Sequence, residues 1–248
     1  MNDIAWTRKT RQEKILEELI LSSKLVTEDV LSEVKKYYKE NPFHTYLHAL
    51  KVASYVLYLN PNEFNLIEIK SLLLAALFHD AGHEWKTTQL DEFISLNIAL
   101  KSIDELVKKN KNFWINWSIV RNSIMWTVFA SRWKIGNRYG KILWDFDIWV
   151  IWEDIVNFLY YSFWLCLEFW QDPETFLTMG QKGYFKYLMW VNRDIIISEE
   201  AREVLPNSYF VITEFCRIAL KDKIKMFETV KNEDITFDEF KNNFFPNY

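Results

Sequence analysis

All four histidines of this chain fall within 40 consecutive residues, and they form two pairs with the same spacing. His44 and His48 lie in the stretch NPFHTYLHA, whereas His79 and His83 lie in ALFHDAGH. Side chains four residues apart lie on one face of an α-helix. Each pair therefore predicts a helical segment that carries two imidazoles on one side.

The remainder of the sequence also favours helices over strands. Only 5 of the 248 residues are glycine and 5 are proline, so turn signals are few, and no segment shows the sustained alternation of a strand. Half of the residues are hydrophobic, which is enough for a sizeable core. The chain is therefore predicted to be all-α, with one helix start marked by Asn41-Pro42. We expect helices over residues 11–21, 28–39, 41–59, 66–78, 91–107, 117–130, 141–170, 174–191 and 209–227.

Charge and cysteine content argue against several classes of protein. The 30 basic and 34 acidic residues give a net charge of −4 without a basic patch, which argues against nucleic-acid binding. The N-terminus lacks the apolar core of a secretory signal, and the longest uncharged run, 155–167, is shorter than the ~20 residues of a membrane span. The two cysteines, Cys166 and Cys216, are too few for a disulfide framework. We expect a cytoplasmic protein that binds no membrane, and the sequence leaves its oligomeric state open.

The histidines have carboxylates as companions. Asp80 directly follows His79, and Asp145 and Asp147 lie in the apolar stretch KILWDFDIW. Imidazole and carboxylate groups together bind divalent metals from zinc to manganese and magnesium. HDAGH alone has the spacing of the zinc-protease motif HExxH, but Asp is one methylene shorter than that motif's base, and Gly82 weakens the helix. A site built from a His on one helix, His-Asp on the next and a later Asp uses both pairs, and we favour it.

These motifs resemble those of the HD superfamily of metal-dependent phosphohydrolases, and they are most similar to those of the cyclic-nucleotide phosphodiesterase catalytic domain. That family has the motifs aromatic-His-Asn-x-x-His-Ala and A-x-x-H-D-x-x-H, which correspond to FHTYLHA (43–49) and ALFHDAGH (76–83) here. The resemblance covers residues 40–190 with gaps. It implies a single catalytic domain over residues 1–248, with the helices of 11–39 and the C-terminal part 209–248 packed on it.

The resemblance also implies roles for individual residues. Asp145 and Asp147 point in different directions because they are two residues apart, and either could instead be a solvated carboxylate at a helix start. The family's ligand is similar to Asp147 in its setting Phe146-Asp147-Ile148. Two divalent ions are implied, with Zn, Mn or Fe in a tight site and Mg or Mn in a second site bridged by Asp80. The implied metal ligands are His48, His79, Asp80 and Asp147, and the implied catalytic residues are His44 as general acid, Asp80, and His83 beside the metal.

A third motif lies nearer the C-terminus. The family's Ser-Gln-x-Gly-Phe-x-x-Tyr resembles GQKGYFKY at 180–187. The resemblance implies that Gln181 hydrogen-bonds a purine base and that Tyr184 stacks on it, although Gln181 on its own would be interpreted as a surface residue of a helix. A family Glu near the metal falls at Asn97 here, and we expect Asn97 to contribute to substrate binding.

Hydrolysis of a small-molecule substrate, a purine 3′,5′-cyclic nucleotide, is the function that the resemblance implies. Thr45 replaces the family's Asn, Lys51 an Asp, and Asn97 a Glu. These departures leave two alternatives. An HD-type nucleotidase or dNTP phosphohydrolase would share the metal site but leave Gln181 and Tyr184 without a role. A catalytically inactive nucleotide-binding protein would keep the site and lose turnover.

Overall fold

The structure is a computed structural model that describes residues 3–39, 41–83, 91–110, 113–127, 136–149, 153–168, 172–174, 177, 198–204, 211, 214–215, 217–233 and 235–248. These residues form helices and no strand, which confirms the all-α prediction. No helix among them is long and apolar enough to cross a membrane. The chain forms two compact units, a larger one of residues 11–147 and 197–204 and a smaller one of the remainder. That residues 1–248 act as one catalytic domain stays a prediction.

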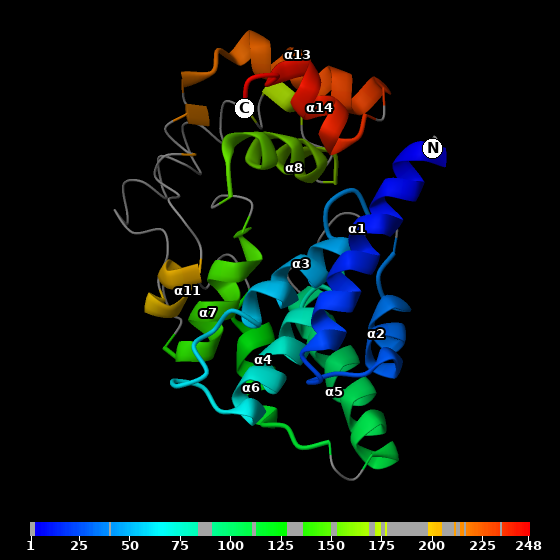
Figure 1. Ribbon diagram of the computed structural model, residues 1–248, viewed down its shortest axis with the longest axis vertical. Helices are drawn as coiled ribbons and strands as arrows, with labels where there is room; N and C mark the ends of the chain where they lie inside the picture. Colours follow the sequence, from blue (N-terminus) through cyan, green and yellow to red (C-terminus); the bar gives the residue numbers. More distant parts are fainter. Residues whose placement is uncertain are drawn as a thin grey trace. The chain divides into compact units, whose positions relative to one another are not determined.

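The larger unit is built around one central helix. Helix α4 packs against α3, α5, α6 and α7, and α11 joins α7 from much later in the chain (Figure 1). The end of α1 and the short α2 precede them. The helices are α1 (Asp3–Ser22), α2 (Glu28–Lys35), α3 (Tyr46–Val56), α4 (Leu66–Phe78), α5 (Asp91–Lys109), α6 (Trp117–Met125), α7 (Arg138–Asp147) and α11 (Glu199–Val204).

Helix α4 is central because its sequence, LIEIKSLLLAALF, is apolar on nearly all sides. Every residue from Leu72 to Phe78 is fully buried. The helix begins with a capping box, in which Asn65 and Glu68 satisfy each other's backbone N–H groups. Its bounds confirm the helix predicted over 66–78. The helix ends directly before His79 and so delivers that residue and the turn after it to the protein interior.

Helix α3 starts later than the sequence predicted. The expected start was Asn41, but the N-cap is Thr45, whose hydroxyl accepts from the His48 backbone N–H at 3.3 Å. The Asn41 amide instead donates to the backbone carbonyls of His44 and His83. His44 therefore precedes the helix, and the prediction that both members of the first pair lie on one helix is wrong.

The smaller unit contains α8 (Ile155–Glu168), α13 (Leu220–Glu233) and α14 (Phe237–Phe244), and α8 packs against the other two. Phe163 of α8 joins them, because its ring lies 5.8 Å from that of Phe227 and 6.0 Å from that of Phe240. Aromatic side chains thus form the contact between these three helices.

Several predicted helix bounds are wrong. The single helix expected over 141–170 is interrupted after Asp147, and α8 begins beyond Asp154, whose carboxylate accepts from the Asn157 backbone N–H at 2.8 Å. A carboxylate that bonds the first turn of a helix marks a helix start. The described bounds also differ at α2, which ends at residue 35, and at α13, which starts at residue 220. The helix expected over 174–191 lies almost entirely outside the described residues.

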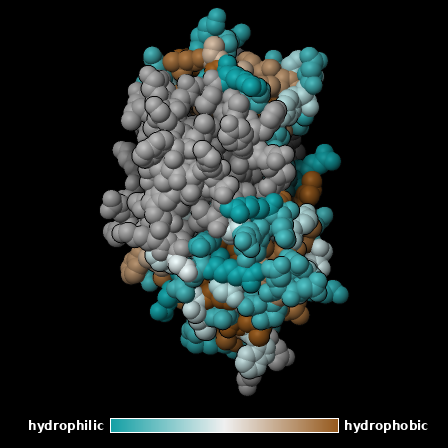
Figure 2. Space-filling model, turned by 90° about the vertical axis from the view of Figure 1, so that its left-hand side faces the viewer, coloured by the Kyte–Doolittle hydropathy of each residue, from teal (hydrophilic) through white to brown (hydrophobic). Residues whose placement is uncertain are grey.

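The surface of the described residues is mixed. On the face in Figure 2, most described side chains are hydrophilic, with hydrophobic ones among them. The most exposed large hydrophobic residues are Leu66, at 72%, and Trp114, at 70%. Scattered apolar residues are ordinary on a folded protein and identify no binding surface by themselves.

Candidate metal centre

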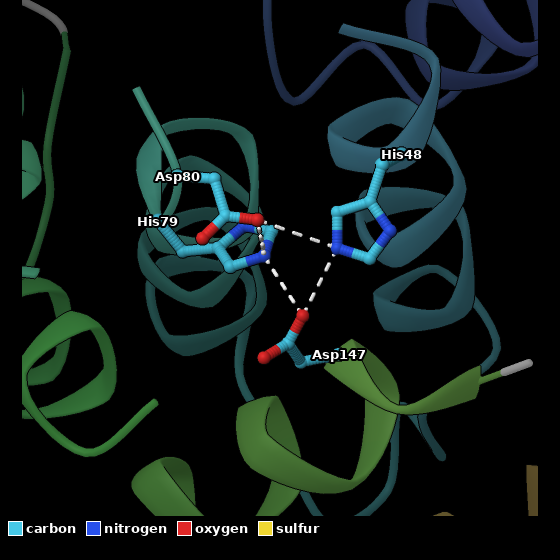
Figure 3. Close-up of side chains that lie close together, drawn as sticks. All are labelled: His48, His79, Asp80 and Asp147. Atoms are coloured by element: carbon cyan, nitrogen blue, oxygen red, sulfur yellow. Dashed lines mark hydrogen bonds and ion pairs between the residues drawn. The ribbon is translucent and has the colours of Figure 1, made fainter. Parts of the chain in front are cut away.

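Four side chains, carried by α3, by the turn after α4 and by α7, meet inside the larger unit (Figure 3). His48 lies in α3, His79 and Asp80 follow α4, and Asp147 is the last residue of α7. Asp147 Oδ1 lies 3.0 Å from His48 Nε2 and 3.1 Å from His79 Nε2, and Asp80 Oδ2 lies 3.0 Å from His79 Nε2. One ligand atom from each residue falls within 4.8 Å of all the others. The fold thus brings together the nitrogen and oxygen atoms of the four residues that are expected to bind metal.

The His79 ring is fixed by a bond on its far side. Its Nδ1 lies 2.7 Å from the Ala76 backbone carbonyl, which can only accept, so Nδ1 carries the proton. Nε2 then faces the cluster with its lone pair available to a cation, because an imidazole held in this way is set in one tautomer. The ring is fully buried, so this orientation is also set by packing.

Charge pairing dominates the electrostatics of this cluster. Burial lowers the pKa of His79, but the Asp80 and Asp147 carboxylates outweigh burial and raise that pKa well above its usual range. Burial raises the pKa of Asp80, yet His79, His83 and His44 hold it well below its usual range. The pKa of Asp147 is lowered to about 2, because the imidazoles outweigh its burial. Both carboxylates are therefore ionised in a buried space, where their charge must be balanced either by protonated imidazoles such as His79 or by a metal cation that displaces those protons.

Two further observations fit a divalent cation. Asp80 Oδ2 is buried, and apart from its ion pairs with His48 and His79 it makes no hydrogen bond, which leaves it available as a ligand atom. The pKa of Glu92, at the start of α5, is raised, first by burial and then by the negative charges of Asp80, Asp91 and Asp147. Two imidazole nitrogens and two carboxylate oxygens are a donor set that suits divalent metals such as zinc and manganese. The residues present therefore fit a divalent ion.

The neighbouring carboxylate, Asp145, has different partners. It is fully buried, and its Oδ2 accepts from the backbone N–H of Ser198 at 2.8 Å and from the Ser198 hydroxyl at 2.6 Å. Asp145 thereby ties α7 to the start of α11. The sequence did not decide which of these two carboxylates joins the histidines. In the structure Asp147 lies in the cluster, whereas Asp145 bonds Ser198 between α7 and α11.

His44 and His83 lie beside the four clustered side chains. His83 Nε2 is 3.2 Å from Asp80 Oδ1, and the His44 and His83 ring centroids are 4.3 Å apart. Burial lowers the pKa of His83, and the charge of Asp80 opposes that shift. The His44 ring also lies 5.8 Å from the His48 ring. All four histidines thus surround Asp80, and His83 bonds the oxygen of Asp80 that is turned away from His79.

Three residues that the sequence analysis missed anchor the turn that carries Asp80. The Ser95 hydroxyl accepts from the Gly82 backbone N–H at 2.8 Å, and the Asn41 amide donates to the His83 carbonyl at 3.2 Å. The Tyr38 hydroxyl donates to the Leu77 carbonyl at 2.9 Å. Tyr38 and Ser95 belong to no motif, and Asn41 was interpreted only as a helix start, so only the fold shows that these side chains anchor this turn.

The structure gives less information on the three residues that are expected to bind substrate. Asn97 lies on α5 with an exposed side chain. Gln181 and Tyr184 lie outside the described residues. A role for these three in substrate binding therefore stays a prediction.

Comparison with known proteins gives sequence matches over part of the chain and a match of the fold to solved structures. No family model matches the chain. A stretch of 91 residues is 34% identical to the 3′,5′-cyclic-AMP phosphodiesterase, isoform F, of Drosophila melanogaster, and it covers 35% of this chain and 14% of that protein. A stretch of 138 residues is 29% identical to the cGMP-specific 3′,5′-cGMP phosphodiesterase 3 of Dictyostelium discoideum, and it covers 52% of this chain and 29% of that protein. The matches therefore span less than a third of either relative.

The fold matches a solved structure over nearly its whole length. The phosphodiesterase domain of the RhoPDE fusion protein from the choanoflagellate Salpingoeca rosetta aligns with a TM-score of 0.59 and 16% identity, over 93% of both chains. The sequence relatives confirm the resemblance to cyclic-nucleotide phosphodiesterases, and the chain has the all-α fold of a phosphodiesterase domain.

Proposed function

We propose that this chain is a metal-dependent phosphodiesterase that hydrolyses a purine 3′,5′-cyclic nucleotide. The observation that carries the proposal is the convergence of His48, His79, Asp80 and Asp147, with His44 directly beside them. The names of its sequence relatives, which are phosphodiesterases of cyclic AMP and cyclic GMP, support the choice of substrate class.

His48, His79, Asp80 and Asp147 would hold the tightly bound ion, for which we propose Zn, Mn or Fe, and Asp80 would also face a more weakly held Mg or Mn. When bound, such ions neutralise charge on phosphoryl oxygens and lower the pKa of a water molecule. His83 holds Asp80 Oδ1 at 3.2 Å and so leaves Oδ2 turned toward His79 Nε2.

His44 is the proposed general acid, which gives a proton to the departing 3′ oxygen. Its ring lies next to the ligand His48 without being one of the four converging groups, as a proton donor to the leaving group requires. We assign Gln181 and Tyr184 to the base edge and the base face, and Asn97 to substrate binding. The two cysteines, which are too few for a disulfide framework, support a cytoplasmic setting.

Turnover by the purified chain tests the substrate class. We expect hydrolysis of cyclic AMP or cyclic GMP, loss of activity on chelation, and recovery when Zn, Mn or Mg is restored. Preferred turnover of nucleoside phosphates would instead identify a nucleotidase, and binding without turnover an inactive protein. Full activity of a chain shown to be metal-free by elemental analysis would refute the metal requirement.

Two variants separate the roles of the histidines. His79→Ala removes a ligand, so both metal content and activity should be lost. His44→Ala should keep its metal while kcat falls by ~10²–10⁴, and the loss should shrink for a p-nitrophenyl phosphodiester, whose leaving group needs no proton. Loss of metal from His44→Ala would show that His44 is a ligand.

A third variant tests the proposed base contact. Gln181→Ala should raise KM for a purine substrate by the equivalent of about 1–3 kcal/mol.

A further inference from the structure

We propose that Asn41 is a positioning residue that fixes the separation of the His44 and His83 imidazoles, an inference that rests on the proposed function for its catalytic meaning. Asn41 is buried, with 5% of the residue exposed. Its Nδ2 donates to the His83 carbonyl at 3.2 Å and to the His44 carbonyl at 3.4 Å. Because both partners are carbonyls and can only accept, the amide nitrogen must face them and the amide oxygen must face away.

The hydrogen bonds from Asn41 matter for both imidazoles, because neither His44 nor His83 lies on a helix. His44 precedes Thr45, the N-cap of α3, and His83 lies five residues beyond the end of α4. His48, by contrast, lies in α3, where the helical backbone holds it. The two ring centroids are only 4.3 Å apart, so a small movement of either backbone segment changes their contact. Asn41 hydrogen-bonds the backbone of both segments at once, across 42 residues of sequence.

An asparagine at this position has a cost as well as a gain. Its Oδ1, which faces away from the two carbonyls, is buried and has no hydrogen-bond partner, and a buried acceptor without a partner is unfavourable. An apolar side chain of the same shape would avoid that cost but would leave the His44 and His83 carbonyls without this donor. Asn41 also caps no helix, because Thr45 caps α3. What the residue does provide is the pair of bonds that joins the two histidine segments.

The first test needs no activity. The chain has four histidines, so carbon-13 labelling of histidine rings gives four Cε1 signals in NMR spectra, which single His→Ala variants can assign. Asn41→Leu removes the tie at nearly constant volume. In the metal-loaded protein it should move the His44 and His83 signals and leave the signals of the ligands His48 and His79 in place. Asn116→Leu is the control, because it removes an amide that caps α6 and touches neither segment.

The second test is kinetic. Asn41→Leu should lower kcat by about 10- to 100-fold at unchanged metal content, with a smaller change in KM, as expected for misplaced catalytic groups. In a His44→Ala background the same change should cost nothing further. Unmoved His44 and His83 signals, or an equal loss of kcat without His44, would overturn the inference. If the parent chain hydrolyses no cyclic nucleotide, the proposed function fails, and the NMR result still decides whether Asn41 positions the two rings.

Discussion

Gly82 offers the sharpest test of how the turn with Asp80 is held. A Cβ added at Gly82 would lie 2.7 Å from the Ser95 backbone nitrogen and 2.7 Å from Ile94 Cγ2, whereas ordinary contact begins at 3.4 Å. The shortfall is 3.4 − 2.7 = 0.7 Å. One of the obstructing atoms is helix backbone, so it cannot rotate away. In Gly82→Ala, either the turn or the first part of α5 must therefore move, and the bond from Gly82 N–H to Ser95 Oγ is strained.

Overpacking of this kind costs about 1–3 kcal/mol. At about 2–4 °C for each kcal/mol in a chain of this size, Tm should fall by about 2–12 °C. Displacing the turn also moves Asp80, so metal affinity should drop by about 10- to 100-fold. Thermal melting followed by circular dichroism and titration with a chelator measure the two effects. Gly136→Ala is the matched control, since a Cβ there meets nothing within 4 Å. Equal Tm and metal affinity in the two variants would refute the packing argument.

Three other outcomes follow from the geometry. Asp147→Ala should lose metal, whereas Asp145→Ala should keep it and lose about 1–3 kcal/mol of stability in urea denaturation, because buried Ser198 donors lose their acceptor; metal retained by Asp147→Ala would contradict the ligand assignment. Acidification should release metal from the parent protein, since protons compete for the ligand imidazoles, and equal affinity at pH 5 and pH 8 would exclude those ligands. Burial raises the pKa of the Cys166 thiol to about 12. In Cys216→Ser, which leaves Cys166 as the single thiol, the folded protein should not react with Ellman's reagent at pH 8, and its stability should decline as pH rises above the ordinary thiol pKa. Rapid labelling of the folded variant would show that Cys166 is accessible.

The residues that the fold brings together could largely be identified from the sequence, because metal-ligand chemistry restricts the choice strongly; that they bind a metal stays a prediction. His48, His79 and Asp80 lie in two short motifs, and few combinations of the chain's four histidines with carboxylates give a usable site. The apolar run of α4 likewise predicted its bounds correctly, because a helix apolar on nearly all sides can only be a core helix. The choice between Asp145 and Asp147 needed the fold, since only the arrival of Ser198 shows where Asp145 is held.

The residues around the cluster could not be predicted, because they act through tertiary contacts. Asn41 and Thr45 are both good helix caps, and local sequence does not decide between them. The Asn41 amide instead donates to the His83 carbonyl, 42 residues away, and Thr45 therefore becomes the N-cap of α3. Ser95 is similar: its hydroxyl meets the Gly82 N–H only because α5 packs against the turn.

The same helix start bears on one of the three departures from the family's motifs, the threonine at position 45 where that family has asparagine. The Thr45 hydroxyl accepts from the His48 backbone N–H and begins α3, so this side chain orients the helix that presents a proposed ligand. Threonine and asparagine are both strong N-cap residues, and each can accept that bond. The exchange therefore preserves the helix start and leaves the metal cluster intact, so it gives no reason to regard this chain as inactive. We accordingly expect Thr45→Asn to retain metal and turnover, whereas Thr45→Val, which has nearly the same shape but no cap, should lose about 1 kcal/mol of stability. Loss of metal from both Thr45→Asn, which keeps a cap, and Thr45→Val, which does not, would show that the hydroxyl has a role beyond the cap.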